Sequence, residues 1–167
     1  MMETKTLDYF LKSFGKMNRA VIQGIKAPHK PLLLLAVLHL VQQRVITCNQ
    51  VALTDELIRG FKRLWMQYVG DADENASVQV AEGLTLDLAL RYPFKCSIAN
   101  PFYHLQHEPF WRLVRSSGFV ERKDYTSIRM LRTCFAYAEI DEDLFLQMVD
   151  EESGEILADS LLRLIVG

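Results

Sequence analysis

The fold is decided by residues 27–38, which read Ala27-Pro28-His29-Lys30-Pro31-Leu32-Leu33-Leu34-Leu35-Ala36-Val37-Leu38. Proline fixes φ and has no N–H donor, so it is tolerated in the first turn of a helix, where that donor lacks a partner anyway. Pro31 stands at this place, and the apolar run behind it predicts a helix to about Gln43. Because the helix is apolar on nearly every side, we expect it to be the central, buried helix.

A similar cassette occurs further along the chain. It reads Asn100-Pro101-Phe102-Tyr103-His104-Leu105 and is soon followed by Pro109-Phe110-Trp111-Arg112-Leu113-Val114. Each cassette places prolines, a histidine and basic or aromatic side chains beside a segment that must be buried. The aromatic content predicts two short strands, residues 100–105 and 110–115, joined as a hairpin by residues 106–109. We expect the two cassettes to present a shaped, cationic, partly apolar surface to a ligand.

Helix start and stop signals organise the rest of the chain. The predicted N-caps are Thr6, Thr54, Ser127, Asp141 and Ser153, and Gly15 is predicted to end the first helix. A short helix over residues 19–25, an acidic loop over residues 70–83 and a third strand over residues 119–122 complete the prediction, while residues 84–99 fit a strand or a helix. The sequence predicts one mostly helical α+β domain, residues 1–167, with a small antiparallel sheet.

Charge is segregated along the chain although the net charge of the 167 residues is only -2. Residues 1–67 have a net charge of +6 and residues 134–167 a net charge of -8. Both cassettes lie in basic segments, which favours a basic face that attracts an anionic partner. Pairing of acidic with basic segments inside the fold explains the same pattern equally well.

Composition also indicates the cellular compartment of the protein. No apolar run approaches the roughly 18 residues that a membrane span needs, and no apolar signal region follows the first residues. Cys48, Cys96 and Cys134 form no closely spaced pair. We therefore expect a reduced, cytoplasmic protein with no membrane association.

Catalytic and metal chemistry have little support in the sequence. His104 and His107 with Cys96 or Glu108 form a weak zinc pattern, because zinc ligands usually show tighter paired spacing. Cys96 has no orienting context for a nucleophile, and the glycines form no phosphate-binding loop. We expect no catalytic residue, no metal and no cofactor.

Phosphate binding has better support. Lys26, His29 and Lys30 lie at or just before the amino-terminal end of the buried helix, which offers unpaired N–H donors and a positive dipole end. Arg19, Arg112 and Arg115 can join them. A core or capping role is an equally good interpretation of His29. Packing of the hairpin onto a helix is the alternative for Phe102, Tyr103 and Trp111, and it is the preferred interpretation of Trp111.

At the two cassettes the sequence resembles a known family. It is similar to the DNA sulfur-binding domain of ScoMcrA-type restriction endonucleases, which are type IV, phosphorothioate-dependent enzymes with an HNH nuclease domain. The resemblance is carried by residues 28–35, by Arg63-Leu64-Trp65, by residues 100–105 leading to Phe110-Trp111, and by residues 139–145 with the closing Leu161-Leu162. It covers nearly the whole chain.

The resemblance implies a domain that binds double-stranded DNA in which sulfur replaces a non-bridging phosphate oxygen. It implies that His29 and Lys30 contact the modified phosphate, and that Pro101 with residues 102–104 forms an apolar pocket for sulfur. Asn100 departs from the family, which often has tyrosine there, and Tyr92-Pro93-Phe94 offers a competing alignment. The family's nuclease domain normally follows, and this chain shows no such metal site, so we expect it not to cut DNA.

The expected DNA- and sulfur-binding residues form one set: Arg19, Lys26, His29, Lys30, Asn100, Pro101, Phe102, Tyr103 and His104. The partner is phosphorothioate-modified duplex DNA, with a nuclease domain or subunit as a further partner in a restriction system. Two alternatives stay open. One is a winged-helix-like module that binds unmodified DNA, and the other is a protein-interaction domain whose basic face meets an acidic partner.

Overall fold

The computed structural model describes residues 4–70 and 94–166. The helices are α1 (Leu7–Gly15), α2 (His29–Gln42), α3 (Asp55–Tyr68), α6 (Ala99–His104), α7 (Ile128–Cys134), α8 (Glu142–Val149) and α9 (Glu151–Val166), with a 3-10 helix, η1, at Leu105–His107. The strands are β1 (Val21–Ile22), β2 (Ile25–Lys26), β3 (Gln50–Val51), β4 (Trp111–Arg115) and β5 (Phe135–Ile140). The fold is α+β and mostly helical, with small antiparallel sheets, as predicted.

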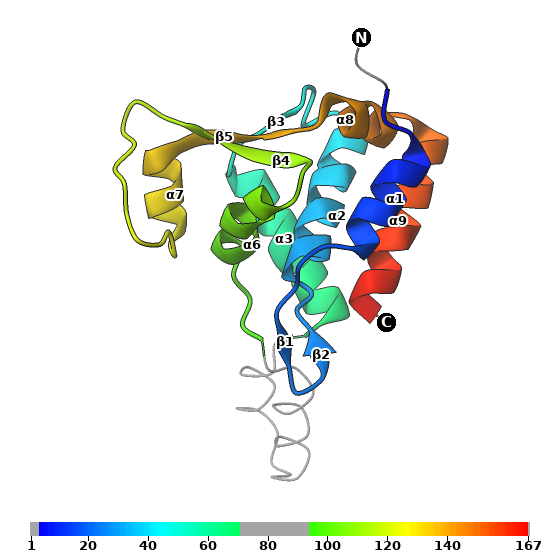
Figure 1. Cartoon of the computed structure of the whole chain (residues 1–167), viewed down its shortest axis with the longest axis horizontal. Helices are drawn as coiled ribbons and strands as arrows, with labels where there is room; N and C mark the ends of the chain where they lie inside the picture. Colours follow the sequence, from blue (N-terminus) through cyan, green and yellow to red (C-terminus); the bar gives the residue numbers. More distant parts are fainter. Residues whose placement is uncertain (1–3, 71–93, 167) are drawn as a thin grey trace.

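Helix α2 runs through the middle of the molecule (Figure 1). It packs against α3, α6, α8 and α9, and every residue from His29 to Leu38 is buried. A helix enclosed in this way must be apolar on all sides, and residues 32–38 meet that demand. The prediction of a central buried helix is confirmed, and its amino-terminal end is held in place by the same packing.

The sheet covers one end of the helical layer. Its strand order is β3-β5-β4, with both pairs antiparallel. Trp111 lies opposite Ile140, Leu113 lies opposite Ala138, and the β4–β5 ladder is irregular between Val114 and Arg115. Strand β4 was predicted, but its partner is β5 rather than residues 100–105, so the predicted hairpin is wrong.

Residues 100–105 are helical because their apolar residues repeat with helical spacing. Ile98, Phe102 and Leu105 are buried on one face, and Pro101 stands in the first turn of α6, where its missing N–H costs nothing. The Asn100 N–H donates to the Ser97 hydroxyl at 3.4 Å. A helical face of this kind outweighs the strand preference of the aromatic residues.

Residues 19–25 also differ from the prediction, since they form part of a β-hairpin instead of a short helix. Val21 and Ile22 pair with Lys26 and Ile25 across the turn Gln23-Gly24. Both turn residues have positive φ, 55° and 78°, as the tight turn that suits the strand twist requires. The hairpin projects from the helical layer beside the amino-terminal end of α2 (Figure 1).

Four predicted N-caps are confirmed by side-chain hydrogen bonds. The Thr6, Thr54 and Ser127 hydroxyls and the Asp141 carboxylate accept N–H groups in the first turns of α1, α3, α7 and α8, and α1 ends at Gly15. Ser153 is not a cap, because α9 begins at Glu151 and the Asp150 carboxylate accepts the Ser153 N–H at 2.9 Å.

Two further predictions fail between α6 and α8. The chain returns to strand β5 after α7, so it is not continuously helical from Ser127. Residues 119–122 lie outside the strands, and β3 supplies the third strand instead. The predictions for residues 71–83 and 84–93, with Tyr92 and Pro93, lie outside the described residues. In the part of the chain that the structure describes, no helix is long and apolar enough to cross a membrane.

Candidate nucleic-acid interface

The amino-terminal end of α2 and helix α6 enclose a cleft of about 310 Å³, here called the α2–α6 cleft. Its lining residues are Asn18, Arg19, Ala20, Ala27, His29, Lys30, Asn100, His104 and His107. A neighbouring cleft of about 340 Å³, the aromatic cleft, shares His29, Asn100 and His104 with it. The remaining lining residues of the aromatic cleft are Ile22, Phe94, Lys95, Ser97, Tyr103, Asp124, Tyr125 and Thr126.

The α2–α6 cleft brings together five of the residues predicted for binding. They are Arg19, His29, Lys30, Asn100 and His104, and they come from both cassettes. Tyr103 lines the aromatic cleft. Lys26 is exposed on β2 and lines neither cleft, and Pro101 and Phe102 are buried and line neither.

His29 is a buried residue at the first position of α2, only 9% exposed. Its Nε2 lies 2.7 Å from the Lys95 carbonyl oxygen, which can only accept, so Nε2 carries the proton and donates. The ring lies against Trp65 with centroids 4.8 Å apart and meets the edge of Phe94. Burial lowers the pKa of His29, and the Lys95 carbonyl only partly opposes this shift.

We expect folding to become weaker in acid because of His29. Its pKa lies below the ordinary 6.5 in the folded state, so its contribution to the free energy of unfolding is complete above pH 6.5 and decreases as the pH falls through 6.5 towards the lowered pKa. His29→Gln keeps an N–H donor for Lys95 but cannot titrate. The melting temperature of the variant should therefore fall less between about pH 7.5 and about pH 5.5 than that of the wild type. Parallel pH profiles would contradict this role.

Lys30 is a buried residue whose ammonium group is hydrogen-bonded within the protein, and its contact with phosphate stays a prediction. Its Nζ donates to the Glu108 carboxylate at 2.7 Å and to the Asn18 carbonyl at 2.6 Å, and Lys30 and Glu108 are each 8% exposed. Glu108 also accepts the Asn18 N–H at 3.1 Å. The ion pair ties the amino-terminal end of α2 to the segment before β1, and its positive charge is balanced within the protein.

Arg19 supplies the cation that remains at the α2–α6 cleft. Its Nε donates to the Ala27 carbonyl at 2.8 Å and its Nη2 to the Leu164 carbonyl at 2.9 Å. Both acceptors are neutral, so the guanidinium keeps its full charge, and within residues 4–70 and 94–166 no acid forms an ion pair with it. A half-buried guanidinium anchored in this way is well placed to attract an anion.

Asn100 and His104 are exposed one turn apart on α6 and face both clefts. The His104 ring is stacked on His107, with centroids 5.6 Å apart. Burial lowers the pKa of His104, and the nearby positive charges of His107 and Lys30 lower it further. A neutral imidazole at this place can donate a hydrogen bond without carrying charge.

Phe102 belongs to the core and not to a pocket wall. It is 1% exposed, its ring meets the edge of Trp111 with centroids 5.6 Å apart, and its carbonyl accepts the Trp111 indole N–H at 3.0 Å. Tyr103, on the next face of α6, packs against Tyr125 and Phe135. The predicted pocket of Pro101 and residues 102–104 is therefore reduced to Tyr103 and His104.

Several residues that line the clefts could not be found from the sequence, because they lie far from α2 in the sequence and approach it only in the folded chain. The Tyr125 hydroxyl donates to the Val120 carbonyl and accepts the Arg122 N–H, both at 3.0 Å, which fixes its ring at the aromatic cleft. Lys95 is held near His29 through its carbonyl. No local pattern connects residues 95 and 125 with α2, so no sequence signal marks them.

The described histidine, cysteine and acidic side chains do not gather into a group of three that could hold a metal ion. A comparison with protein-family models finds no match, and a comparison with curated proteins finds no relative.

Proposed function

We propose that this chain binds double-stranded DNA carrying phosphorothioate linkages, and that the α2–α6 cleft receives the sulfur-bearing phosphate. The observation that carries the proposal is the convergence of the two cassettes: His29, Asn100 and His104 line both clefts although α2 and α6 are far apart in the sequence. The buried ion pair between Glu108 and Lys30, a residue that lines the cleft, fixes the amino-terminal end of α2 there and also supports this proposal.

The chemistry of the lining suits sulfur. Sulfur is larger and more polarisable than oxygen and accepts hydrogen bonds poorly, so it gains from contact with apolar and aromatic groups. Ala20 and Ala27 offer methyl groups in the cleft, and His29 and His104 offer ring edges. At this apolar part of the lining an ordinary phosphate oxygen would lose its water without gaining a hydrogen bond, which creates a preference for sulfur.

General attraction to the DNA backbone comes from cations around the clefts. Arg19 lines the α2–α6 cleft, Lys95 lines the aromatic cleft, and Lys26 is exposed on the neighbouring hairpin. Lysine and arginine attract modified and unmodified phosphates alike. Preference for sulfur and overall affinity therefore depend on different residues, which makes them separable by mutation.

The proposal describes a non-catalytic recognition module, without metal or cofactor, in a cytoplasmic type IV restriction system. Cleavage of the DNA would then be supplied by an HNH nuclease domain or by a separate nuclease subunit.

The test is a titration with two duplexes of identical sequence, one with a phosphorothioate and one without. We expect the modified duplex to bind at least about tenfold more tightly, which corresponds to about 1.4 kcal/mol. Equal affinity for both duplexes would contradict the sulfur preference and favour a winged-helix-like module for unmodified DNA. Absence of binding to either duplex would contradict DNA recognition and favour a protein-interaction domain.

Variants of exposed residues separate the two contributions. His104→Ala should lower the ratio of the dissociation constant of the unmodified duplex to that of the modified duplex, because it removes a ring that lines both clefts. Lys95→Gln should weaken both duplexes alike and reduce the slope of affinity against salt by about one. Arg129→Gln, which removes an exposed cation from α7, is the matched control and should change neither quantity.

A further inference from the structure

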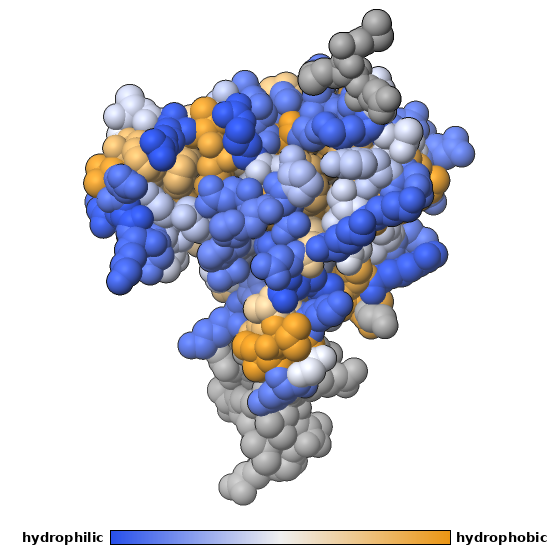
Figure 2. Space-filling view, viewed as in Figure 1, coloured by the Kyte–Doolittle hydropathy of each residue, from blue (hydrophilic) through white to orange (hydrophobic). Residues whose placement is uncertain are grey.

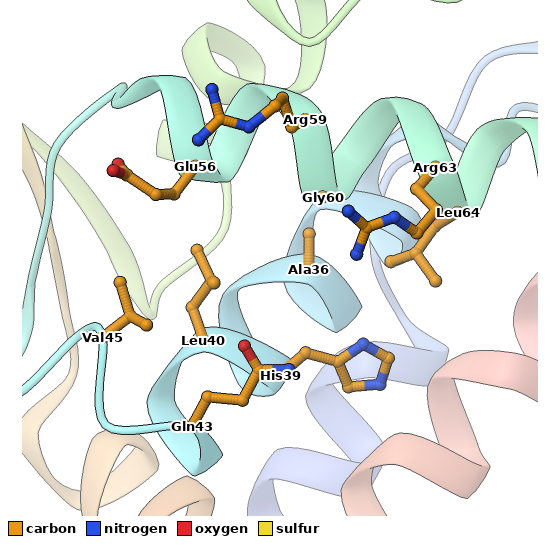
Figure 3. Close-up of a pocket in the computed structure, with 10 residues that line it drawn as sticks. All are labelled: Ala36, His39, Leu40, Gln43, Val45, Glu56, Arg59, Gly60, Arg63 and Leu64. Atoms are coloured by element: carbon orange, nitrogen blue, oxygen red, sulfur yellow. The ribbon is translucent and has the colours of Figure 1, made fainter.

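A separate pocket of about 230 Å³ lies between α2 and α3, at the opposite end of α2 from the α2–α6 cleft (Figure 3). From α2 it is lined by Ala36, His39 and Leu40, with Gln43 just beyond the end of that helix. From α3 it is lined by Glu56, Arg59, Gly60, Arg63 and Leu64. Neither the predicted binding residues nor the proposed function uses this pocket.

Two small residues keep the pocket open. Ala36 and Gly60 face each other across it, so the two helices leave a hollow there (Figure 3). Glycine is unfavourable in the interior of a helix compared with alanine, and a Cβ at Gly60 would meet no atom within 4 Å. Packing therefore does not require glycine at position 60. The absence of a side chain there leaves free space between α2 and α3.

Several polar side chains around the hollow can donate hydrogen bonds to a ligand. The Arg63 guanidinium extends over Ala36 towards His39, and the Gln43 amide points in from the end of α2 (Figure 3). Among the described residues neither Arg59 nor Arg63 forms an ion pair, whereas Asp55, on the same helix, pairs with Arg132 at 2.9 Å.

The two ends of the pocket differ in their charged and polar side chains. His39 is half-buried, and burial lowers its pKa, so its ring is neutral near pH 7 and can donate one N–H. Glu56 lies at the end of the pocket away from Arg63, and the Arg59 guanidinium extends towards Glu56 at that end (Figure 3). An anion is therefore attracted more to the end formed by Arg63, His39 and Gln43 than to the end that contains Glu56.

We propose that this pocket binds a phosphate group, held by the Arg63 guanidinium together with the side-chain N–H groups of Gln43 and His39, with Arg59 at the rim. The planar fork of a guanidinium matches two phosphate oxygens, and such charge-assisted hydrogen bonds are stronger than neutral ones. The same chemistry has two sources, a free phosphate compound or the backbone of a nucleic acid that crosses α3. The proposal does not depend on recognition of sulfur at the α2–α6 cleft.

The first arm of the test uses inorganic phosphate, titrated at constant ionic strength against the isotope-labelled chain. The amide signal of Gly60 and the side-chain signal of Arg63 should shift and saturate, with a dissociation constant on the order of 1 mM. Arg63→Gln should weaken binding at least about tenfold, and Glu56→Gln should strengthen it by removing repulsion. Lys62→Gln is the matched control, because Lys62 is exposed on α3 but does not line the pocket.

Gly60→Leu tests the hollow itself. A Cβ at residue 60 would meet no atom within 4 Å, and replacement of a glycine inside a helix favours the helix. We therefore expect the chain to fold with an unchanged or higher melting temperature. The leucine side chain should nevertheless occupy the space and abolish the phosphate-dependent shifts. A variant that keeps both its stability and its phosphate response would overturn the assignment of the anion to this pocket.

The second arm distinguishes the sources. If the phosphate belongs to a nucleic acid, Arg63→Gln should reduce the slope of duplex affinity against salt by about 0.9, while the ratio between modified and unmodified duplexes stays the same. If inorganic phosphate binds but this slope does not change, the ligand is a free phosphate compound. No saturable shift at Gly60 and no change of slope would overturn the proposal, as would equal responses of Lys62→Gln and Arg63→Gln.

Discussion

Replacing Lys30 by alanine is expected to lower the free energy of unfolding by about 3–5 kcal/mol, because the change leaves the Glu108 carboxylate buried without its partner. Lys30 and Glu108 are each 8% exposed, and the Lys30 Nζ lies 2.7 Å from the Glu108 Oε2. The variant also removes the hydrogen bond from Lys30 to the Asn18 carbonyl. Urea unfolding followed by circular dichroism measures the effect.

A double variant separates the buried charge from the loss of packing. In Lys30→Met with Glu108→Gln neither residue is charged, and the new amide can still accept the Asn18 N–H. We expect the double variant to regain at least half of the lost stability, because a buried ion pair contributes little net stability compared with uncharged residues of similar size. The surface pair Lys12–Asp8 is the control, and Lys12→Ala should change stability by less than about 0.5 kcal/mol.

The stability effect decides how DNA measurements on Lys30 must be interpreted. Loss of binding in Lys30→Ala follows from a distorted α2–α6 cleft as well as from a lost phosphate contact. The folded fraction must therefore be measured in the binding buffer. If Lys30→Ala lowers the free energy of unfolding by less than about 1 kcal/mol and still weakens DNA binding, the DNA reaches Lys30, and the assignment of Lys30 to a buried, stabilising ion pair is wrong.

The sequence predicts the central helix well because its signal is local and strong. Pro31 in the first turn and an apolar run with no polar face allow only a buried helix, and α2 ends at Gln42, one residue from the prediction. The capping side chains Thr6, Thr54, Ser127 and Asp141 are equally local, since each accepts N–H groups within three residues.

The errors arise where a short segment fits two structures. Residues 100–105 contain aromatic residues, which favour strands, but their burial follows helical spacing, and tertiary packing selects the helix. Strand β5 follows α7 directly and pairs with both β3 and β4. Its six residues are too few for their periodicity to exclude a helix. In the hairpin, Gln23-Gly24 is a weaker turn signal than Asn-Gly, so the two-residue turn was missed.

The sequence predicted part of the lining of the clefts but not the contacts of its residues. Of the nine residues predicted for binding, Arg19, His29, Lys30, Asn100 and His104 line one cleft, whereas Lys26, Pro101 and Phe102 line neither cleft. Glu108, the ion-pair partner of Lys30, is however 78 residues away in the sequence. No local sequence pattern indicates that this lysine forms an ion pair with a buried carboxylate. Lys30 forms a buried ion pair with Glu108, so among the described residues that line this cleft Arg19 is the lysine or arginine without an ion pair.

Replacing Phe102 by alanine is expected to cost about 3–5 kcal/mol of unfolding free energy, the usual range for a large aromatic side chain removed from a core. Phe102 is 1% exposed and its ring meets the edge of Trp111. Phe102→Leu refills most of the space and should cost no more than about 1.5 kcal/mol. Urea unfolding of the two variants against the wild type provides the measurement.

The same two variants decide whether Phe102 belongs to the core or to the sulfur site. Phe102→Leu remains folded, so its ratio of dissociation constants for modified and unmodified duplexes can be measured directly, and we expect the wild-type ratio. His104→Ala is the complementary case, because His104 is exposed and lines both clefts; it should leave stability within about 0.5 kcal/mol of the wild type and lower the ratio. A lowered ratio in Phe102→Leu with unchanged stability would place the Phe102 ring against the bound sulfur and would contradict its assignment to the core.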